Sequence, residues 1–215
     1  MTTSAIDLTE LEADALTELV NLGVGRAAAS LARMVGGPVS LSVPAVKIVT
    51  YAEAAALTMR GNTGSLVAVQ QRFVGVFSGT ALLVFPEARS LELVRAVVGE
   101  AIPLEDVVDL EQEAVAEIGN VVLNGCLATM ANMLRQRLDM SLPDVLRTTD
   151  AQLFATARRE GEDGHVLFLF IDFHMREREI KGYIALLMDL PSLERLKELI
   201  GDFIQRATSA PAEPG

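Results

Sequence analysis

A chain of 215 residues that is half hydrophobic and 22% charged can bury a substantial core, which excludes an intrinsically disordered protein. Its net charge of −11, with no basic run, argues against a nucleic-acid partner because the charge repels a phosphate backbone. The single cysteine, Cys126, excludes an internal disulfide and fits a reduced, cytoplasmic setting. Residues 1–12 carry acids where a signal peptide needs a basic start and an apolar stretch, and no run approaches the roughly 20 apolar residues that span a bilayer. We therefore predict a soluble protein without a membrane partner.

The first half of the chain predicts a long helix, then strands, then a shorter helix. Apolar residues recur at helical spacing from residue 8 to about residue 35, and Thr9 and Glu12 have the spacing of a capping box at its start. Segments rich in β-branched residues predict strands at residues 39–50, 65–71 and 79–85. Pro86 is expected to open a helix that ends near residue 99.

The second half repeats this order. Asp109 is expected to cap a helix running to about residue 138, strands are predicted at residues 165–175 and 180–188, and Pro191 opens a closing helix. Strands in runs, flanked by two long helices, indicate an α+β fold with a mostly antiparallel sheet and pseudo-twofold symmetry. We expect one domain at residues 1–206, built from two similar halves at about 7–99 and 106–205. A disordered tail is expected to follow it at residues 207–215.

One four-residue pattern occurs in both halves. The first copy consists of Asp14, Glu18, Asn21 and Pro44. The second copy consists of Glu113, Glu117, Asn120 and Pro143. Each member of the second copy lies 99 positions after its counterpart, as 113 does after 14. On a helix the two acids and the asparagine span about 60° of arc and form one narrow stripe. The residues roughly opposite the first stripe should face the core, and they are Leu16, Val20, Ala27, Leu31 and Met34.

A solvated helix face is the ordinary explanation of one acidic stripe. The helix dipole favours Asp14 and Glu113, the leading acids, because both are expected near a helix start. It does not account for Glu18 and Glu117, the motif glutamates, which lie beyond the first turn. Like charges four residues apart cost roughly 0.2–0.5 kcal/mol, so two such pairs oppose local stability unless a cation meets them. The repetition therefore favours a functional site.

Small residues continue the motif face of each helix. In the first helix they are Gly25, Ala28, Ala29 and Ala32, and the corresponding positions in the second are Asn124, Leu127, Ala128 and Ala131. Gly23 and Gly25 also occupy a helix interior, at a cost of about 1 kcal/mol each against alanine. Such residues permit close approach of another surface. The sequence leaves open whether that surface is a partner or a neighbouring helix of the same fold.

The doubled pattern resembles the signature of the CheC/CheX/FliY family: Asp or Ser, three residues, Glu, two residues, Asn, 22 residues and Pro. Residues 15–28 match the first copy and residues 116–125 the second, within a resemblance that runs from about residue 7 to residue 205. Two copies indicate the CheC type over CheX, which has one, and the absence of a further C-terminal domain argues against FliY. Glu113 departs from the signature, which has Asp or Ser there.

This resemblance implies a phosphatase, a hydrolase acting on the aspartyl phosphate of CheY-like response regulators in chemotaxis and two-component signalling. By carry-over, the motif asparagines, Asn21 and Asn120, orient the attacking water, and the motif glutamates pair with the lysine of the receiver. The leading acids support docking, and the motif prolines, Pro44 and Pro143, fix where strands begin. The chain needs no metal of its own, because the phosphorylated receiver is expected to supply Mg²⁺.

Two other roles stay open. The chain could be a non-catalytic adaptor that binds a phosphorylated receiver or a CheD-like deamidase, or it could have a structural role at the flagellar switch. Other reactive residue types predict structural roles. Cys126 falls on the core side of its helix, His165 and His174 stand at opposite ends of one strand, and residues 167–171 are apolar on both faces of a covered sheet.

Overall fold

The computed structural model describes residues 7–59, 65–98, 104–155, 165–175 and 178–209. The first half contributes, in order, α1 (Glu10–Val35), β1 (Val39–Ser42), β2 (Val46–Thr50), α2 (Tyr51–Met59), β3 (Ser65–Gly75), β4 (Gly79–Pro86) and α3 (Glu87–Val98). The second half contributes α4 (Leu104–Met133), β5 (Leu138–Met140), β6 (Asp144–Thr149), α5 (Asp150–Ala155), β7 (His165–Met175), β8 (Arg178–Met188) and α6 (Leu190–Ser209).

The two halves exchange strands within one antiparallel sheet. The described strands form an eight-stranded sheet in the order β1-β7-β8-β4-β3-β5, with β2 also pairing with β7 and β6 with β3. Thus β1 and β2 of the first half lie on β7 of the second, and β5 and β6 of the second lie on β3 of the first. Strands β4 and β8 join the halves at the centre. Neither half therefore completes its own sheet, and the predicted α+β fold with pseudo-twofold symmetry is confirmed.

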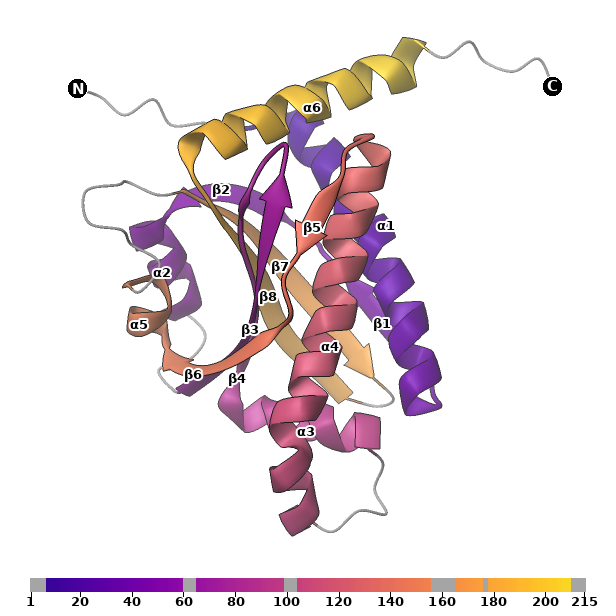
Figure 1. Ribbon diagram of the computed structural model, residues 1–215, viewed down its shortest axis with the longest axis vertical. Helices are drawn as coiled ribbons and strands as arrows, with labels where there is room; N and C mark the ends of the chain where they lie inside the picture. Colours follow the sequence, from indigo (N-terminus) through magenta and orange to yellow (C-terminus); the bar gives the residue numbers. More distant parts are fainter. Residues whose placement is uncertain (1–6, 60–64, 99–103, 156–164, 176–177, 210–215) are drawn as a thin grey trace, which may run out of the picture.

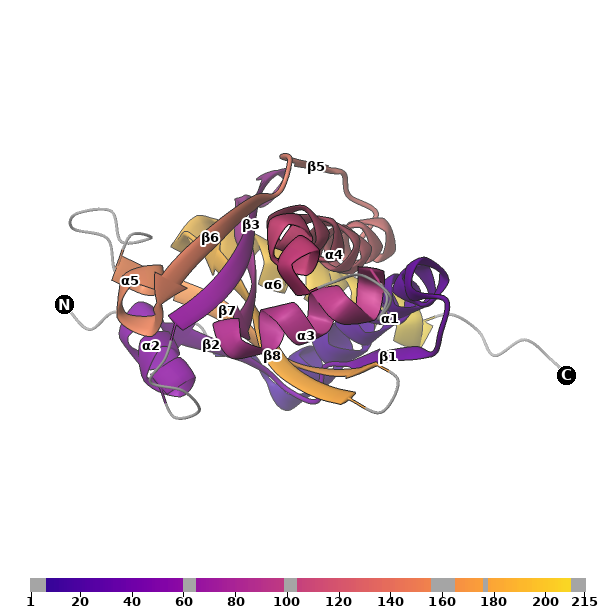
Figure 2. The same ribbon diagram turned by 90° about the horizontal axis from the view of Figure 1, so that it is seen from below.

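Helices cover both faces of the sheet. Figures 1 and 2 show α1 and α4 side by side on one face and the short helices α2 and α5 together on the other. Strand β7 contributes to both layers. Leu167, Leu169, Ile171 and Phe173 enter the larger core under α1 and α4, while Val166 and Phe168 enter the smaller core under α2 and α5. The expected covered sheet is confirmed, and its larger core supports the two motif helices.

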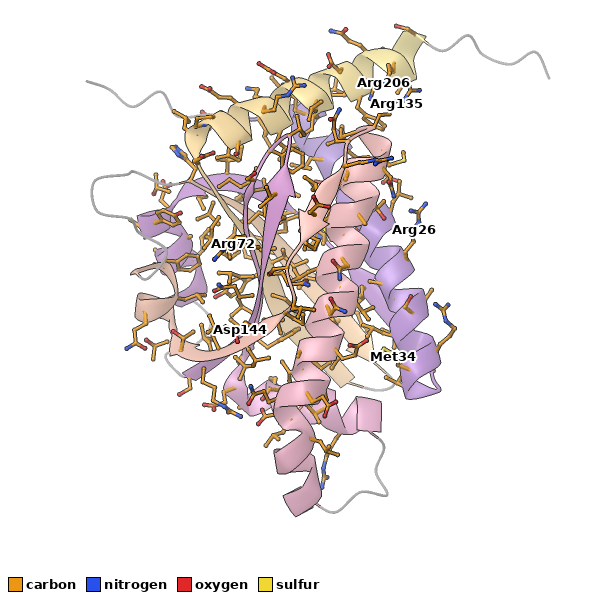
Figure 3. All side chains as sticks on the ribbon, viewed as in Figure 1. Arg26, Met34, Arg72, Arg135, Asp144 and Arg206 are labelled. Carbon is orange, nitrogen blue, oxygen red and sulfur yellow. The ribbon has the colours of Figure 1, made fainter. Side chains whose placement is uncertain are left out.

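The first motif helix has the predicted ends. Thr9 and Glu12 form the complete capping box, in which the Thr9 N–H donates to Glu12 Oε2 at 2.8 Å and the Glu12 N–H donates to Thr9 Oγ1 at 3.3 Å. Gly36 ends the helix in the left-handed conformation (φ 60°). One expected core residue is wrong, because Met34 is 38% exposed near the end of α1 (Figure 3).

The second motif helix differs from its prediction at both ends. Helix α4 begins at Leu104, so Asp109 lies inside it and is not its cap. It ends at Met133, about one turn before the predicted residue 138, because Arg135 takes a left-handed backbone conformation (φ 58°) and breaks the helical path.

Four short elements and one helix end also depart from the sequence predictions. Helices α2 and α5 and strands β5 and β6 were not predicted, and the predicted strand at residues 39–50 is divided into β1 and β2 around Pro44. Helix α6 continues to Ser209, so residues 207–209 of the expected disordered tail are helical. The remainder of that tail, residues 210–215, lies outside the described residues.

One described segment contradicts the expectation that no part of the chain is apolar enough to span a bilayer. Residues Leu110–Met133 of α4 meet that criterion by length and composition. More than half of the 18-residue stretch that meets the criterion is buried within the protein, and α4 packs against α1 and the sheet. The buried core helix of a soluble protein passes the same test, so this apolar character is explained by the packing of α4.

Helices α1 and α4 cross in close contact at glycine. A Cβ atom on Gly23 would lie 2.7 Å from Cys126 Cα and 2.8 Å from the Gly125 carbonyl oxygen. A Cβ atom on Gly125 would in turn lie 3.0 Å from Ala27 Cβ. The chain colours in Figure 1 show that the two helices run in opposite directions past this crossing. The glycines therefore set the distance between the two motif helices.

Candidate functional site

The acidic residues of both motif copies lie on exposed helix surface. Asp14 and Glu18 are exposed on α1, and Glu113 and Glu117 are exposed on α4. Within the described part of the chain, none of the four makes a hydrogen bond or an ion pair. Each helix therefore presents two like charges four residues apart that no cation among the described residues neutralises, an arrangement that costs some helix stability. The same four carboxylates are accessible to a partner.

The first motif asparagine is held by the backbone of the residue that precedes the motif proline. Asn21 Oδ1 accepts a 2.8 Å hydrogen bond from the Val43 N–H, and Asn21 Nδ2 donates a 3.0 Å hydrogen bond to the Val43 carbonyl. Val43 is only 1% exposed, and Pro44 follows it between β1 and β2. The 22-residue spacing is thus explained in this copy by a two-point lock on the amide. One Nδ2 hydrogen and one Oδ1 lone pair remain for another ligand.

The second motif asparagine is held by side chains instead. Asn120 Oδ1 accepts hydrogen bonds from Gln71 Nε2 at 3.1 Å and from Asn124 Nδ2 at 2.6 Å. The residue before the motif proline, Leu142, is 88% exposed, whereas its counterpart Val43 is buried. The motif spacing is the same, but the local geometry is not. Sequence reasoning missed Gln71, and the signal available for it was a polar residue within an apolar strand.

The motif copies form two separate sites. Residues 14–21 precede Gly23 on α1, and residues 113–120 precede Gly125 on α4. Because the helices are antiparallel, residues that precede the crossing on each helix lie at opposite ends of the pair (Figure 1). The two motif copies are therefore separated along the helix pair.

The small residues of the motif face divide between two kinds of surroundings. Ala28 and Ala131, on the motif faces of α1 and α4, are buried; Gly23, which packs against α4, lies on the opposite side of α1 and is not part of this face. Gly25 is exposed, with no atom within 4 Å of a Cβ placed there, and Ala29 and Ala128 are also exposed. Part of the motif face is thus buried within the fold, and part remains on the surface.

A glutamate beside each motif anchors its helix. Glu12 closes the capping box on α1 and lies 3.6 Å from Lys197 of α6. Burial acts to raise the pKa of Glu12, but hydrogen bonds from Thr9 and the charge of Lys197 outweigh it and lower that pKa. Its counterpart on α4, Glu111, is buried and bonded to Ser90 of α3 and Arg147 of β6.

A small pocket lies beside the start of the second motif. Residues of α4, β3 and β6 line a cavity of about 230 Å³, namely Val67, Glu111, Gln112, Val115, Val145 and Arg147. Hydrogen bonds to Glu111 and Glu87 raise the pKa of Arg147, because both carboxylates favour its charged form. The guanidinium is thus already occupied by two carboxylates, and the network fixes α4 against α3 and β6.

The remaining reactive residue types have structural positions. Cys126 is buried at the α1–α4 crossing, and burial raises the pKa of its thiol to about 12, so the thiolate is not formed at neutral pH. His165 and His174 stand at the ends of β7 as predicted. Among the described residues, no group of three or more His, Cys, Asp or Glu side chains is arranged to hold a metal ion.

Comparisons with known proteins find relatives over most of this chain. It is 23% identical over 201 residues to the CheY-P phosphatase CheC of Bacillus subtilis (strain 168), covering 89% of this chain and 95% of CheC. It is 21% identical over 212 residues to the flagellar motor switch phosphatase FliY of the same strain, covering 96% of this chain but only 53% of FliY. Models of known protein families give no match.

Solved structures share the fold at low sequence identity. Thermotoga maritima FliY superposes with a TM-score of 0.73 at 17% identity, covering 91% of this chain and 98% of that one. The FliM middle domain from Vibro alginolyticus superposes with a TM-score of 0.60 at 14% identity, covering 86% of this chain and 99% of that one. CheX from Desulfovibrio desulfuricans superposes with a TM-score of 0.50 at 16% identity, covering 79% of this chain and 99% of that one. The protein therefore has the CheC-like α+β fold. Sequence and fold together support membership of the CheC/CheX/FliY family.

Proposed function

We propose that this chain is a phosphatase that hydrolyses the aspartyl phosphate of a CheY-like response regulator at two sites. The observation that carries the proposal is the repeated pairing of an exposed, unpaired glutamate with an asparagine whose amide is fixed by hydrogen bonds. The sequence similarity to a protein named as a CheY-P phosphatase supports the same reaction.

The asparagines suit the positioning of water rather than proton abstraction. An amide is not basic at neutral pH, but it offers N–H donors and a carbonyl acceptor. In the proposed reaction the oxygen of a water held by this amide attacks phosphorus while the bond from phosphorus to the aspartyl oxygen breaks. The aspartate leaves as a carboxylate, and the water protons pass to phosphate and solvent. Phosphoryl transfer responds mainly to alignment and charge stabilisation, so an amide that is fixed in place and aligns the water is sufficient for the proposed role.

The motif glutamates suit recognition of a cation on the receiver. Glu18 lies one helical turn before Asn21, and Glu117 lies one turn before Asn120, so each carboxylate neighbours its asparagine on the same stripe. A lysine of the receiver that pairs with this carboxylate would fix the aspartyl phosphate in register with the asparagine. The receiver brings its own Mg²⁺ in this proposal.

A non-catalytic adaptor is the second candidate. The FliM middle domain has the same fold, so the fold alone does not specify catalysis. Tight binding of a phosphorylated receiver without faster phosphate release would favour the adaptor. A CheD-like deamidase stays a predicted partner, and the test is to measure its binding to this protein in the same way.

The proposal is tested by phosphate release from a phosphorylated receiver mixed with a substoichiometric amount of this protein. A phosphatase turns over many receivers per molecule. An adaptor leaves the rate of release at that of the receiver alone.

Replacing both motif glutamates, Glu18→Gln with Glu117→Gln, is expected to lower kcat/KM at least about tenfold, because a charge-assisted hydrogen bond is worth roughly 1.5–3 kcal/mol. The unfolding free energy should stay unchanged or rise by about 0.2–0.5 kcal/mol per helix, because each substitution relieves repulsion with a leading acid. Initial rates and urea unfolding measure the two effects. Glu10→Gln, an exposed acid of α1 outside the motif, is the matched control. Unchanged kcat/KM in the double variant would contradict the assigned role.

A further inference from the structure

Gln71 is a polar residue in an apolar row. Along the face of β3 that points to α1 and α4, the core residues are Val67, Val69 and Phe73, and Gln71 lies between the last two. It is 1% exposed, and its Oε1 has no hydrogen-bond partner among the described residues. The next residue, Arg72, points away from α4 to the opposite side of the strand (Figure 3). A buried amide with an unsatisfied oxygen lowers stability, so its presence calls for a function.

The other half of the molecule shows what the fold alone requires at this place. Strand β7 is the counterpart of β3, because Phe173 pairs with Leu41 of β1 as Phe73 pairs with Met140 of β5. Counting back two residues from each phenylalanine equates Gln71 with Ile171, which is buried and apolar. The fold therefore accepts an aliphatic side chain at this position.

The amide nitrogen of Gln71 is directed at the second site. It donates to Asn120 Oδ1 at 3.1 Å and to the Ser141 carbonyl at 3.0 Å, two residues before the motif proline. Helix α4 comes close enough for this contact because Gly119 packs on Val69, where an added Cβ would lie 2.4 Å from the valine side chain. Gln71 thus links Asn120 to the segment that carries Pro143, the link that the Val43 backbone provides for Asn21.

The result is a different set of free hydrogen-bonding atoms at the two sites. Asn120 Oδ1 accepts from both Gln71 and Asn124, so its two lone pairs are used, and Nδ2 has no partner in the described part of the chain. Asn21 uses one lone pair and one N–H on Val43 and keeps one of each. The second site can therefore only donate to a water, whereas the first can both donate and accept.

We infer that Gln71 is a positioning residue that holds the Asn120 amide with its nitrogen toward the receiver, and that the two sites hold the attacking water differently. This inference rests on the proposed phosphatase function. Gln71 acts through Asn120, since a side chain 1% exposed cannot itself reach a receiver.

The test is Gln71→Ile, which installs the residue of the equivalent position, combined with Asn21→Ala so that only the second site is active. The expected result is a fall in kcat of about 10- to 100-fold, as for a misplaced catalytic group, with KM for the receiver within about twofold. Gln70→Ile in the same background is the matched control, because adjacent strand residues point to opposite faces. Gln71→Ile should not lower kcat further when Asn120→Ala is already present, because both substitutions act through the same group.

A second measurement is independent of catalysis. In ¹⁵N spectra, Gln71→Ile should shift the side-chain amide signals of Asn120 and leave those of Asn21 in place. Three results would overturn the inference. They are Asn120 signals that do not move, a kcat that Gln71→Ile leaves unchanged in the Asn21→Ala background, and a fall in kcat of the same size when Asn120→Ala is already present. If neither site of the unaltered protein releases phosphate, the proposed function fails, and the spectra still decide whether Gln71 positions Asn120.

Discussion

Replacing both motif asparagines, Asn21→Ala with Asn120→Ala, is expected to reduce catalysed phosphate release by about 10²–10³, the usual cost of losing a preorganised polar group at a reacting centre. The proposed chemistry leaves little else to the protein, because the receiver supplies the acyl phosphate and the metal. Each single variant should remove the contribution of one site only. The measurement is the initial rate of release from a phosphorylated receiver, at receiver concentrations that saturate the unaltered protein.

Stability must be separated from catalysis in this comparison. Asn21→Ala also removes both hydrogen bonds to the buried Val43 backbone, which costs roughly 1–3 kcal/mol. Thermal unfolding should therefore show a larger loss for Asn21→Ala than for an exposed asparagine such as Asn132, whose alanine variant is the control for activity as well. A double variant that remains folded and dephosphorylates the receiver at the original rate would contradict the role of the asparagines.

The second large effect is expected at the helix crossing. Gly23→Ala should lower the unfolding free energy by roughly 1–3 kcal/mol, because the new Cβ meets backbone atoms of Cys126 and Gly125 that cannot rotate away. This loss should exceed the gain of about 1 kcal/mol that alanine brings to a helix interior. Both motifs lie on the crossing helices, so separation of α1 and α4 should also lower the rate of phosphate release.

Gly25→Ala is the matched control, two residues along the same helix. No atom lies within 4 Å of a Cβ at that position, so the substitution should stabilise the protein by up to about 1 kcal/mol. Urea unfolding of the two variants measures the contrast directly. If both substitutions change the unfolding free energy in the same direction and by a similar amount, the crossing at Gly23 is less tightly packed than described.

Local signals in the sequence predicted local structure well. The Thr9–Glu12 capping box and the β-branched runs at residues 65–71 and 79–85 each depend on neighbouring residues, and each predicted its element. The short helices α2 and α5 were not predicted, because six to nine residues carry too little periodicity to identify a helix. The start of α4 escaped because Asp109 resembles a cap, yet the helix begins five residues earlier.

Long-range features needed the structure. Duplication was visible from the 99-residue displacement, but nothing in the spacing showed that β1 and β2 pair with β7 while β5 and β6 pair with β3. The same displacement predicted two sites that share one four-residue pattern. Their difference depends on Gln71, 49 residues before Asn120 and outside the repeated motif, and on Leu142, whose exposure its sequence does not reveal.

Substoichiometric turnover of a phosphorylated receiver tests the central claim most directly. Receivers of the same organism are phosphorylated, mixed with about one-hundredth as much of this protein, and followed for phosphate release with the Asn21→Ala/Asn120→Ala variant alongside. A phosphatase with two positioned asparagines predicts release of many equivalents, faster than from the receiver alone, and loss of that acceleration in the variant. Receivers that bind the protein but release phosphate at their own rate would contradict the claim and identify the protein as an adaptor.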